Sequence, residues 1–560
     1  MSRFSMAEAS HRTLIFALIL ISYVFLMFGN GIVSLTHPDE VFYTQTAKEM
    51  ITHQSWMTPY IFDEPQFEKP VLFFWLLKSV ILTFGMTPFA ARFWPAFFGM
   101  LGVCFTYGLA WMLFGKKRTA FLSGLALTTS FIYIALSRAV LTDMVFSIWV
   151  VISIAFFYYG YRYPQRKTLG ILLGFVFAGI AVLTKGLLGI CFPMAVLGGY
   201  LLFKRDLKFL KCWAALWGLA LFAVIAVPWH VLMVQKYGQE FIQEYVFNVH
   251  MRRLFVAEHR KCDTWYFYPG LLFGGMMPWL LFLFPAWGEA ITAIRKKNIF
   301  RDPYVFLLFW IGGILIFVQP AHSKLASYVF PAFPAVAIVL GHYLSGLVDR
   351  PLAYLSLNWG RVTGFVMAGL LAVVCVLVIV FAGIYKEYVV DMFPVYVFSG
   401  LVLVSACCLF LFALKRQYAK MPFAVCGVSL ALLTTLLIGR PYAEPWVSCE
   451  RITREFKEID TSDSVVLASK FYVRGARFYT DRDMAVIDIN GEGFYSPHPI
   501  PFLNTDEKVV AFLETQLVTY GIVKEGNVKD LRRITRKGGF RMEELREEGG
   551  KYIVKIMKIK

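Results

Sequence analysis

Two adjacent carboxylates, Asp39 and Glu40, stand in the stretch HPDEVFYTQTAKEM at residues 37–50. They follow an apolar run, Thr13 to Leu35, that is long enough to cross a hydrocarbon core of about 30 Å. A carboxylate at that boundary can accept a proton from a hydroxyl group, or stabilise positive charge on a sugar ring in a transition state. The alternative is structural, because acidic residues also cap the N-termini of helices, here that of TQTAKEM.

Further ionisable residues fall at the same ends of the predicted membrane helices. Asp143, in SRAVLTD, supplies another carboxylate, and glycosyl transfer commonly uses two. A phosphate group can be held by Lys as a point charge and by Arg through two hydrogen bonds. The remaining residues of this set are Glu68, Lys69, Arg138, Lys185, His250, Arg252, Arg253, His259, Lys324 and Tyr328. The alternative for each charged member is interfacial snorkelling, in which a long side chain only reaches water.

Metal binding and disulfide formation are both open from the sequence. Glu68, His250 and His259 are residue types that bind a divalent metal, but they lack the tight ligand spacing of a dedicated zinc site. Glu68 and His250 are therefore candidate ligands for a divalent metal, with contact to a lipid headgroup as the alternative. Cys262 and Cys449 fall in polar regions on the outer side, where a disulfide between them is a hypothesis that sequence alone does not establish.

The composition indicates a membrane protein. The chain has 560 residues, of which 58% are hydrophobic and 16% charged, with a mean hydropathy of +0.61. Such a composition lies far outside the range of soluble globular proteins. The net charge of +18 does not indicate a nucleic-acid partner, because the Lys and Arg clusters fall in short connections between apolar runs, where they set membrane orientation. We therefore expect a multi-pass protein in a lipid bilayer that binds no nucleic acid.

Apolar runs of spanning length predict thirteen transmembrane helices, beginning near residues 13, 89, 119, 143, 168, 186, 211, 269, 303, 325, 361, 392 and 421. Basic connections at residues 116–118, 162–167, 204–208, 295–297 and 415–416 all face the cytoplasm if the N-terminus is cytoplasmic. A further run, Val71–Met86, breaks this parity. We expect it to be a short interfacial helix in the first outer loop. The first run is too long for a signal-peptide core, so we expect it to remain as the first helix.

The chain changes character after Arg440. Strand-like runs such as SVVLA and LVTYGIVK alternate with charged helical stretches over residues 441–560, which predicts a small soluble α/β domain. An odd number of spans places this domain outside, across the membrane from the N-terminus. We therefore expect a transmembrane domain at residues 1–440 and a soluble periplasmic domain at residues 441–560.

Several motifs follow one another over about the first 335 residues. They are PDE (38–40), FEKPVLFFWL (67–76), AARFWPAFFG (90–99), SRAVLTD (137–143), LTKG (183–186), PWH (228–230), HMRRLF (250–255) and SKLASYVFPAFPA (323–335). As an ordered set they resemble those of the membrane glycosyltransferases with a GT-C fold that use polyprenyl-phosphate sugars. The resemblance is to the branch that contains the lipid A aminoarabinose transferases and the protein mannosyltransferases. It implies a GT-C fold with about thirteen transmembrane helices and interfacial helices in the first outer loop.

The resemblance also implies roles for individual residues. Asp39 is expected to be the main catalytic carboxylate, with Asp143 and Glu40 as further acidic contributors. The other implied positions are Lys69 and Arg253 for the lipid phosphate, Arg138, Lys185 and Lys324 for additional positive charge, Tyr328 for the donor cavity, and Glu68 and His250 for a metal or headgroup. Phe42 and Gln66 depart from the Arg and Tyr of the aminoarabinose branch, which leaves the sugar and the acceptor open.

The hypothesis that follows is a transferase of the bacterial inner membrane. An acceptor oxygen attacks the anomeric carbon of a sugar carried on undecaprenyl phosphate and displaces the lipid phosphate with inversion. The candidate sugar is 4-amino-4-deoxy-L-arabinose. The expected acceptor is lipid A or another periplasmic molecule, and the expected state is a monomer. A protein or glycan O-glycosyltransferase of the same fold is one alternative. A lipid or solute transporter is another, although transporters commonly show internal repeats and none is visible here.

Overall fold

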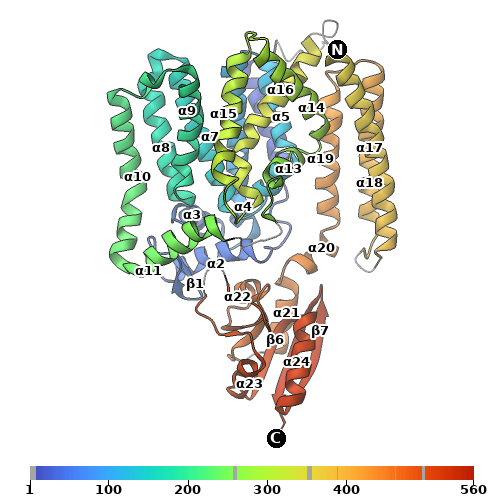
Figure 1. Cartoon of the computed structure of the whole chain (residues 1–560). Coiled ribbons are helices and arrows are strands. Elements are labelled where there is room, and N and C mark those ends of the chain that lie inside the picture. The colour runs from blue at the N-terminus through green and yellow to red at the C-terminus, as the bar shows by residue number, and fades with distance from the viewer. Residues whose placement is uncertain are drawn as a thin grey trace. The chain divides into compact units, whose positions relative to one another are not determined.

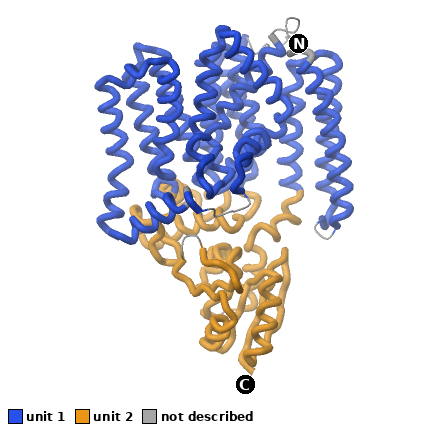
Figure 2. The backbone as a smooth tube through the Cα atoms, in the orientation of Figure 1, with its two compact units in different colours: residues 1–30, 69–73, 92–438 blue, residues 31–68, 74–91, 439–560 orange. Residues whose placement is uncertain are grey.

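The computed structural model describes residues 8–256, 262–349, 356–386, 389–460, 462–494 and 498–559. Its chain folds into two compact units, which Figure 2 distinguishes by colour. Unit 1 comprises residues 1–30, 69–73 and 92–438, and unit 2 comprises residues 31–68, 74–91 and 439–560. Most of the first outer loop thus belongs to the same compact unit as the C-terminal segment. The predicted domain boundary after residue 440 stays a prediction.

Unit 1 consists of helices (Figure 1). They are α1 (His11–Ser22), η1 (Tyr23–Met27), α4 (Pro88–Phe114, whose first residues belong to unit 2), α5 (Lys117–Thr128), α6 (Phe131–Ser137), α7 (Thr142–Arg162), η2 (Pro164–Arg166), α8 (Lys167–Lys185), α9 (Leu188–Lys204), η3 (Leu207–Phe209), α10 (Trp213–Tyr237), α11 (Gln239–Phe241), η4 (Ile242–Met251), α12 (Arg252–Phe255), α13 (Phe267–Gly274), α14 (Leu280–Arg295), α15 (Arg301–Val318), η6 (Ala326–Ala332), α16 (Phe333–Asp349), α17 (Ser356–Ile384), α18 (Phe393–Leu414) and α19 (Met421–Ile438).

The helices confirm a multi-pass α-helical membrane protein. Within the described ranges, nine helices are long and apolar enough to cross a bilayer, and α5 with α6, bent by 65°, would make a tenth. Helical structure covers every predicted run, but α1 with η1 and α9 are shorter apolar helices, and the run from residue 269 is divided between α13 and α14. The predicted number of thirteen spans is therefore not confirmed and stays a prediction.

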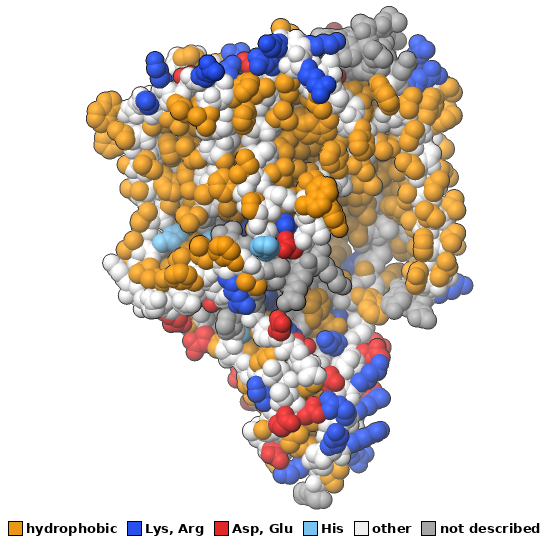
Figure 3. Space-filling view, viewed as in Figure 1, with side chains coloured by type: hydrophobic (Ala, Val, Ile, Leu, Met, Phe, Trp, Pro, Cys, Tyr) orange, Lys and Arg blue, Asp and Glu red, His pale blue; other side chains and the backbone are white. Residues whose placement is uncertain are grey.

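The surface of unit 1 has the pattern of a bilayer-embedded bundle. Figure 3 shows apolar side chains in a broad belt around the helices, with Lys and Arg side chains gathered at the upper end of the bundle in that view. Apolar side chains face lipid at little cost, whereas cationic side chains are stable where they reach water and headgroups.

Close packing of α7 against α8 sets the register of these antiparallel neighbours. A Cβ atom added at Gly170 would lie 2.5 Å from the backbone N of Gly160, and one added at Gly174 would lie 2.6 Å from the ring of Phe157. The Ser153 hydroxyl also donates a hydrogen bond of 2.7 Å to the carbonyl of Gly174. Small residues permit this approach of two membrane helices. Because the helices are antiparallel, the start of α7 meets the end of α8.

The first outer loop of unit 2 forms α2 (Asp39–Thr52), the short strands β1 (Tyr60–Ile61) and β2 (Glu64–Pro65), and most of α3 (Leu72–Phe84). The buried Glu49 carboxylate accepts hydrogen bonds from the backbone N–H groups of Phe62 (3.1 Å) and Asp63 (2.9 Å), both of which have positive φ. These bonds hold the β1–β2 turn against α2.

The length of α3 agrees with the prediction that Val71–Met86 does not cross the membrane. Its 13 residues extend about 20 Å at 1.5 Å per residue, which is less than a hydrocarbon core of about 30 Å. The Lys78 ammonium donates to the carbonyls of Met50 (3.1 Å) and Ser55 (3.0 Å), so this cation satisfies carbonyl groups at the end of α2.

The C-terminal part of unit 2 is the predicted small α/β domain. Its sheet has the order β5-β4-β3-β6-β8-β7, in which β5, β4, β3 and β6 are parallel and β8 is antiparallel to β6 and β7. The elements are α20 (Arg440–Val447), α21 (Glu450–Ile459), β3 (Val466–Ser469), α22 (Val473–Thr480), β4 (Met484–Ile487), β5 (Phe502–Leu503), α23 (Asp506–Glu514), β6 (Val518–Lys524), α24 (Glu525–Gly538), β7 (Phe540–Glu548) and β8 (Lys551–Lys558). The runs SVVLA and LVTYGIVK supply β3 and β6.

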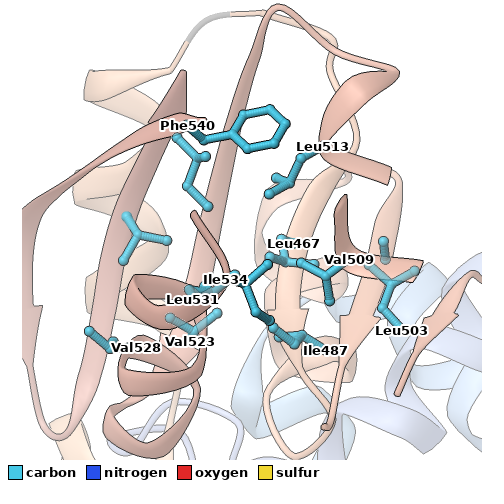
Figure 4. Packing of buried hydrophobic residues seen from close by; sticks show 13 residues of the cluster. Leu467, Ile487, Leu503, Val509, Leu513, Val523, Val528, Leu531, Ile534 and Phe540 are labelled. Atoms are coloured by element: carbon cyan, nitrogen blue, oxygen red, sulfur yellow. The ribbon is translucent and has the colours of Figure 1, made fainter. Parts of the chain in front are cut away.

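An apolar cluster lies between this sheet and the helices α23 and α24 (Figure 4). Leu467 and Val523 contribute from the parallel strands, Val509 from α23, and Leu531 from α24, and each of these side chains is fully buried. Burial of such side chains stabilises a fold by about 1.5–3 kcal/mol each relative to exposure. The domain therefore has a hydrophobic core of its own.

Buried polar contacts within unit 2 join the outer loop to the C-terminal domain. The Glu444 carboxylate, only 3% exposed, accepts a hydrogen bond of 2.7 Å from the backbone N–H of Ser34 and one of 3.1 Å from Arg440. The Tyr479 hydroxyl donates 3.0 Å to the Leu35 carbonyl. Burial alone would raise the pKa of Glu444, but the hydrogen bonds from Ser34 and Arg440 keep that pKa below its usual value. The carboxylate is therefore ionised where the loop joins the domain.

His37 makes a further contact of this kind. Its backbone N–H donates 3.1 Å to the Val447 carbonyl, and its ring lies 3.7 Å from the buried thiol of Cys449. Cys449 and Cys262 are both free thiols, so a disulfide between them is absent from the structure. Burial, followed by the nearby charge of Lys551, lowers the pKa of His37 from 6.5 to about 3. The folded unit 2 therefore holds His37 neutral.

Acidification should loosen the contact that His37 makes. Between pH 6.5 and about 3 the unfolded state binds one more proton at this residue than the folded state, so this contribution to stability is present above pH 6.5 and falls by about 1.4 kcal/mol per unit below it. We expect His37→Phe, which keeps an aromatic ring beside Phe471 and Tyr472, to reduce the pH dependence of hydrogen exchange in β6 by that amount. His53→Phe, at a histidine that is a third exposed, is the control. Equal pH dependence in His37→Phe and the natural protein would contradict the prediction.

Candidate functional site

Unit 1 contains a buried ion pair between Asp143 and Lys185. Asp143 lies in the first turn of α7 and Lys185 in the last turn of α8, so the packing of these helices brings the two side chains into contact. Both are about nine-tenths buried. The carboxylate also accepts a hydrogen bond from Ser327, and the charge of Lys69 acts on it. The structure thus brings together three residues that the sequence singled out.

Tyr328 completes this cluster from η6. Its ring lies 4.7 Å from the Lys185 ammonium, and the Phe146 ring lies 5.7 Å from the same nitrogen. A cation over an aromatic face is stabilised by the ring quadrupole. Lys69 and Lys185 thus both act on the carboxylate of Asp143. Cationic side chains gathered in this way can take part in binding an anion.

Lys324 is paired with a residue that the sequence analysis did not select. Its ammonium lies 2.7 Å from Asp263, whose other carboxylate oxygen lies 2.6 Å from His322. Hydrogen bonds from Lys324 and then His322 keep the pKa of Asp263 below its usual value. Asp263 stands in a polar connection outside the motifs, so no spacing pattern marked it. Its place beside Lys324 becomes evident only in the folded chain.

His250 lies against the residue that follows Lys185. Its Nδ1 is 2.6 Å from the Tyr245 carbonyl, and its Nε2 would lie 2.5 Å from a Cβ atom at Gly186, which has a φ of +111°. Only glycine fits here, for both the backbone conformation and the contact. The Tyr245 hydroxyl lies 3.1 Å from Nε2 of His230, the histidine of the PWH motif. His250, Tyr245 and His230 therefore form one polar group close to Lys185.

The remaining predicted residues of unit 1 have different surroundings. Arg138 donates to the carbonyls of Phe25 (3.2 Å) and Phe28 (2.9 Å), where it satisfies the end of the first helical segment. The side chain of Arg253, in α12, and the whole of His259 lie outside the described residues. The predicted roles of Arg138 and Arg253 stay predictions.

Metal binding by Glu68 and His250 also stays a prediction. In the described parts of the chain, no group of three or more His, Cys, Asp and Glu side chains is arranged to hold a metal ion. Glu68 and Lys69 are adjacent residues at which the chain passes from unit 2 to unit 1. The Glu68 backbone N–H donates 3.0 Å to the side-chain carbonyl of Gln66, which orders the FEKP turn.

The two carboxylates of the PDE motif differ sharply in unit 2. Glu40 is buried, and its carboxylate accepts hydrogen bonds of 2.9 Å from both the backbone N–H and the hydroxyl of Thr36. These contacts hold the segment that precedes α2 and differ from the helix cap that the sequence offered as the alternative, because α2 begins at Asp39 with no side-chain cap hydrogen bond. Asp39, in the first turn of α2, is exposed. Asp39 is therefore the residue of the pair that an incoming molecule can reach.

A cluster on the same helix was missed by sequence reasoning. Phe42 lies one turn after Asp39, and the Arg474 guanidinium from α22 lies 4.5 Å from its ring. Arg474 also donates to Nε2 of His498, at 3.3 Å from Nε and 3.0 Å from Nη2. Burial and the charge of Arg474 lower the pKa of His498 to about 3, against the influence of Glu68. Arg474 and His498 stand about four hundred and thirty residues or more from Phe42, so no local pattern could connect them.

Comparisons with known proteins identify similar chains. The family described as dolichyl-phosphate-mannose-protein mannosyltransferase matches residues 12–239. An uncharacterized protein of Aquifex aeolicus is 26% identical over 471 residues, or 83% of this chain and 87% of that relative. An undecaprenyl phosphate-alpha-4-amino-4-deoxy-L-arabinose arabinosyl transferase of Erwinia tasmaniensis is 30% identical over 314 residues, or 55% of each chain. The match thus spans little more than half of that named relative.

A solved structure shares the fold over nearly the whole chain. ArnT from Cupriavidus metallidurans bound to undecaprenyl phosphate has a TM-score of 0.77 at 20% identity, with 98% of each chain covered. The apo state of the same protein has a TM-score of 0.78 at 21% identity, with 97% of each chain covered. The predicted GT-C fold with a small C-terminal sheet domain is therefore confirmed, as is the predicted resemblance to the aminoarabinose transferases.

The Asp143–Lys185 pair should show strong energetic coupling. Removal of either partner leaves an unpaired buried charge, which destabilises a protein by about 3–5 kcal/mol. We expect Lys185→Met and Asp143→Asn each to lower the thermal stability of the full-length protein in lipid nanodiscs, and the double variant to be less destabilised than the sum of the two.

Lys204→Met is the matched control, because Lys204 pairs with Asp302 at a site where both side chains are more exposed, 28% and 50%. Exposed pairs contribute about 0–1 kcal/mol. Strictly additive effects of Lys185→Met and Asp143→Asn would show that the two charges do not stabilise each other.

Proposed function

We propose that this GT-C-fold protein, similar to the aminoarabinose transferases, is a membrane glycosyltransferase that moves a sugar from a polyprenyl-phosphate carrier to an acceptor with inversion. The observation that carries the proposal is the buried cluster in unit 1, where Lys185 pairs with Asp143, Lys69 acts on the same carboxylate and Tyr328 packs on Lys185. A phosphate ester is the kind of anion that such a cluster binds. The whole-chain likeness to a protein solved with undecaprenyl phosphate supports undecaprenyl phosphate as the carrier.

The sugar that we propose is 4-amino-4-deoxy-L-arabinose. The named relatives with 30% and 27% identity are arabinosyl transferases for that sugar. The acceptor that we propose is lipid A, with another periplasmic molecule as the broader possibility. Phe42 and Gln66, which depart from the pattern of the aminoarabinose branch, lie in unit 2 near Asp39 and Glu68, where they bear on the choice of acceptor.

In the proposed reaction an oxygen of the acceptor forms a bond to the anomeric carbon. The bond from that carbon to the phosphate oxygen breaks, and its electron pair stays on the departing phosphate, which gains one negative charge. Lys69, Lys185 and Lys324 stabilise that charge as it builds, together with Arg253 and Arg138, and Tyr328 lines the cavity beside Lys185. Attack from the face opposite the phosphate gives inversion.

Asp39 orients the acceptor and takes its proton when the attacking oxygen belongs to a hydroxyl group. A phosphate oxygen is already ionised at neutral pH, so an acceptor phosphate has no proton to give and Asp39 then acts by orientation and charge. Asp143 holds Lys185 in place. We assign Glu68 and His250 to contact with the headgroup or a divalent metal.

We further propose that the protein is a monomer of the bacterial inner membrane with a cytoplasmic N-terminus and a periplasmic C-terminal domain. The gathering of Lys and Arg at one end of unit 1 supports this orientation, because basic connections favour the cytoplasmic side (Figure 3).

A second candidate is a protein O-glycosyltransferase of the same fold. The family match over residues 12–239 favours it, since that family is described as transferring mannose to protein. The two candidates share the donor chemistry and differ in the acceptor. Assays with a lipid acceptor and a peptide acceptor separate them, and movement of the carrier across the bilayer without sugar transfer would indicate transport.

Asp39→Asn and Lys69→Ala should each reduce transfer of a labelled sugar from undecaprenyl phosphate by at least about 100-fold, the size of effect seen when one stabilising group is removed from a transition state. Lys69→Ala should also weaken binding of undecaprenyl phosphate, whereas Asp39→Asn should leave that binding unchanged. The measurement is the initial rate of transfer in proteoliposomes beside carrier binding in detergent.

Lys48→Ala is the matched control, because Lys48 lies on α2 and pairs with Asp481 at the surface of unit 2. It should retain near-normal transfer. Near-normal turnover in both Asp39→Asn and Lys69→Ala would refute the proposed roles.

A further inference from the structure

Arg474 differs from the other arginine on the same helix. Arg477, one turn later on α22, forms ion pairs with Asp63 and Asp483, the latter at 2.9 Å. Arg474 has its hydrogen bonds to the ring nitrogen of His498, and no carboxylate among the described residues pairs with it. A half-buried guanidinium without a carboxylate partner is a binding group for an external anion.

Aromatic rings fix the plane of this guanidinium. Its Cζ lies 4.5 Å from the centre of the Phe42 ring and 5.8 Å from that of Phe494. A guanidinium has about five N–H donors in a rigid fork. The two contacts to His498 use one edge. Among the described residues the fork makes no other hydrogen bond, and its planar geometry matches two oxygens of a phosphate or carboxylate.

The guanidinium packs on the helix that carries Asp39. Phe42 follows Asp39 by three residues, and residues at that spacing are neighbours on one face of a helix. An anion held by Arg474 therefore lies beside the helix whose first turn carries Asp39. This arrangement belongs entirely to unit 2, whereas Lys69, Lys185 and Lys324 belong to unit 1.

We infer that Arg474 binds an anionic group of the acceptor, most simply a phosphate, and thereby orients the acceptor oxygen toward Asp39. The inference rests on the proposed transferase function and specifies its acceptor class as a phosphorylated molecule. It also gives the C-terminal domain a definite role, because α22 supplies the anion-binding residue. The phosphate of the donor carries the same chemistry, so the experiment must distinguish the two sources.

Direct binding to the full-length protein provides the test without requiring turnover. Immobilised protein in detergent is titrated with a tritiated bisphosphorylated diglucosamine lipid, with its dephosphorylated form, and with tritiated undecaprenyl phosphate. Arg474→Gln should weaken binding of the bisphosphorylated lipid about 10- to 100-fold, the range for hydrogen bonds to a charged group. Binding of undecaprenyl phosphate should change less than about twofold, and Arg474→Lys should be intermediate because it keeps the charge but loses the fork.

Arg477→Gln is the matched control and should leave binding of both lipids unchanged. Hydrogen exchange in β6 verifies that the variants are folded. If Arg474→Gln is not folded, Arg474→Lys takes its place in the binding measurement. Unchanged binding of the bisphosphorylated lipid, equal binding of its dephosphorylated form, or a loss confined to undecaprenyl phosphate would each overturn the inference. The expected binding pattern without any sugar transfer would uphold it and refute the proposed transferase.

Discussion

Burial of charge at the contact between α7 and α8 is the constraint on which the rest of unit 1 depends. A lysine and an aspartate at this depth are stable only as partners, and they meet because Gly160 and Gly170 let the two helices approach closely. Lys69 adds a second cation that acts on Asp143. In the proposed function these cations bind the phosphate of the lipid carrier.

Unit 2 also contains buried ionisable groups, which lie where the outer loop contacts the C-terminal domain. The outer loop that carries Asp39 has buried apolar side chains of its own, and it is also held by polar groups buried against the C-terminal domain. Glu444 is ionised and His37 neutral at that contact, so each is in the protonation state that its hydrogen bonds require. The C-terminal domain therefore stabilises the loop directly, in addition to the role in acceptor binding that we infer for Arg474.

The sequence predicted the parts of this structure that depend on local pattern. Long apolar runs identified the helices, alternating runs identified β3 and β6, and the order of the motifs indicated the fold. The sequence did not distinguish the roles of Asp39 and Glu40, because only the folded loop shows that Thr36 donates two hydrogen bonds to the Glu40 carboxylate. Asp263 and Arg474 were missed because each acts with residues far away in the chain. Their partners are set by helix packing and sheet topology, which single-residue patterns do not record.

The central claim is that the positive cluster of unit 1 holds a carrier phosphate while the sugar leaves it. The most direct measurement supplies the purified full-length protein in proteoliposomes with undecaprenyl phosphate that carries isotope-labelled 4-amino-4-deoxy-L-arabinose, together with lipid A, and follows the label by NMR. The account predicts that the label appears on lipid A with the opposite anomeric configuration. Label that stays on undecaprenyl phosphate, or crosses the bilayer still attached to it, would contradict the account.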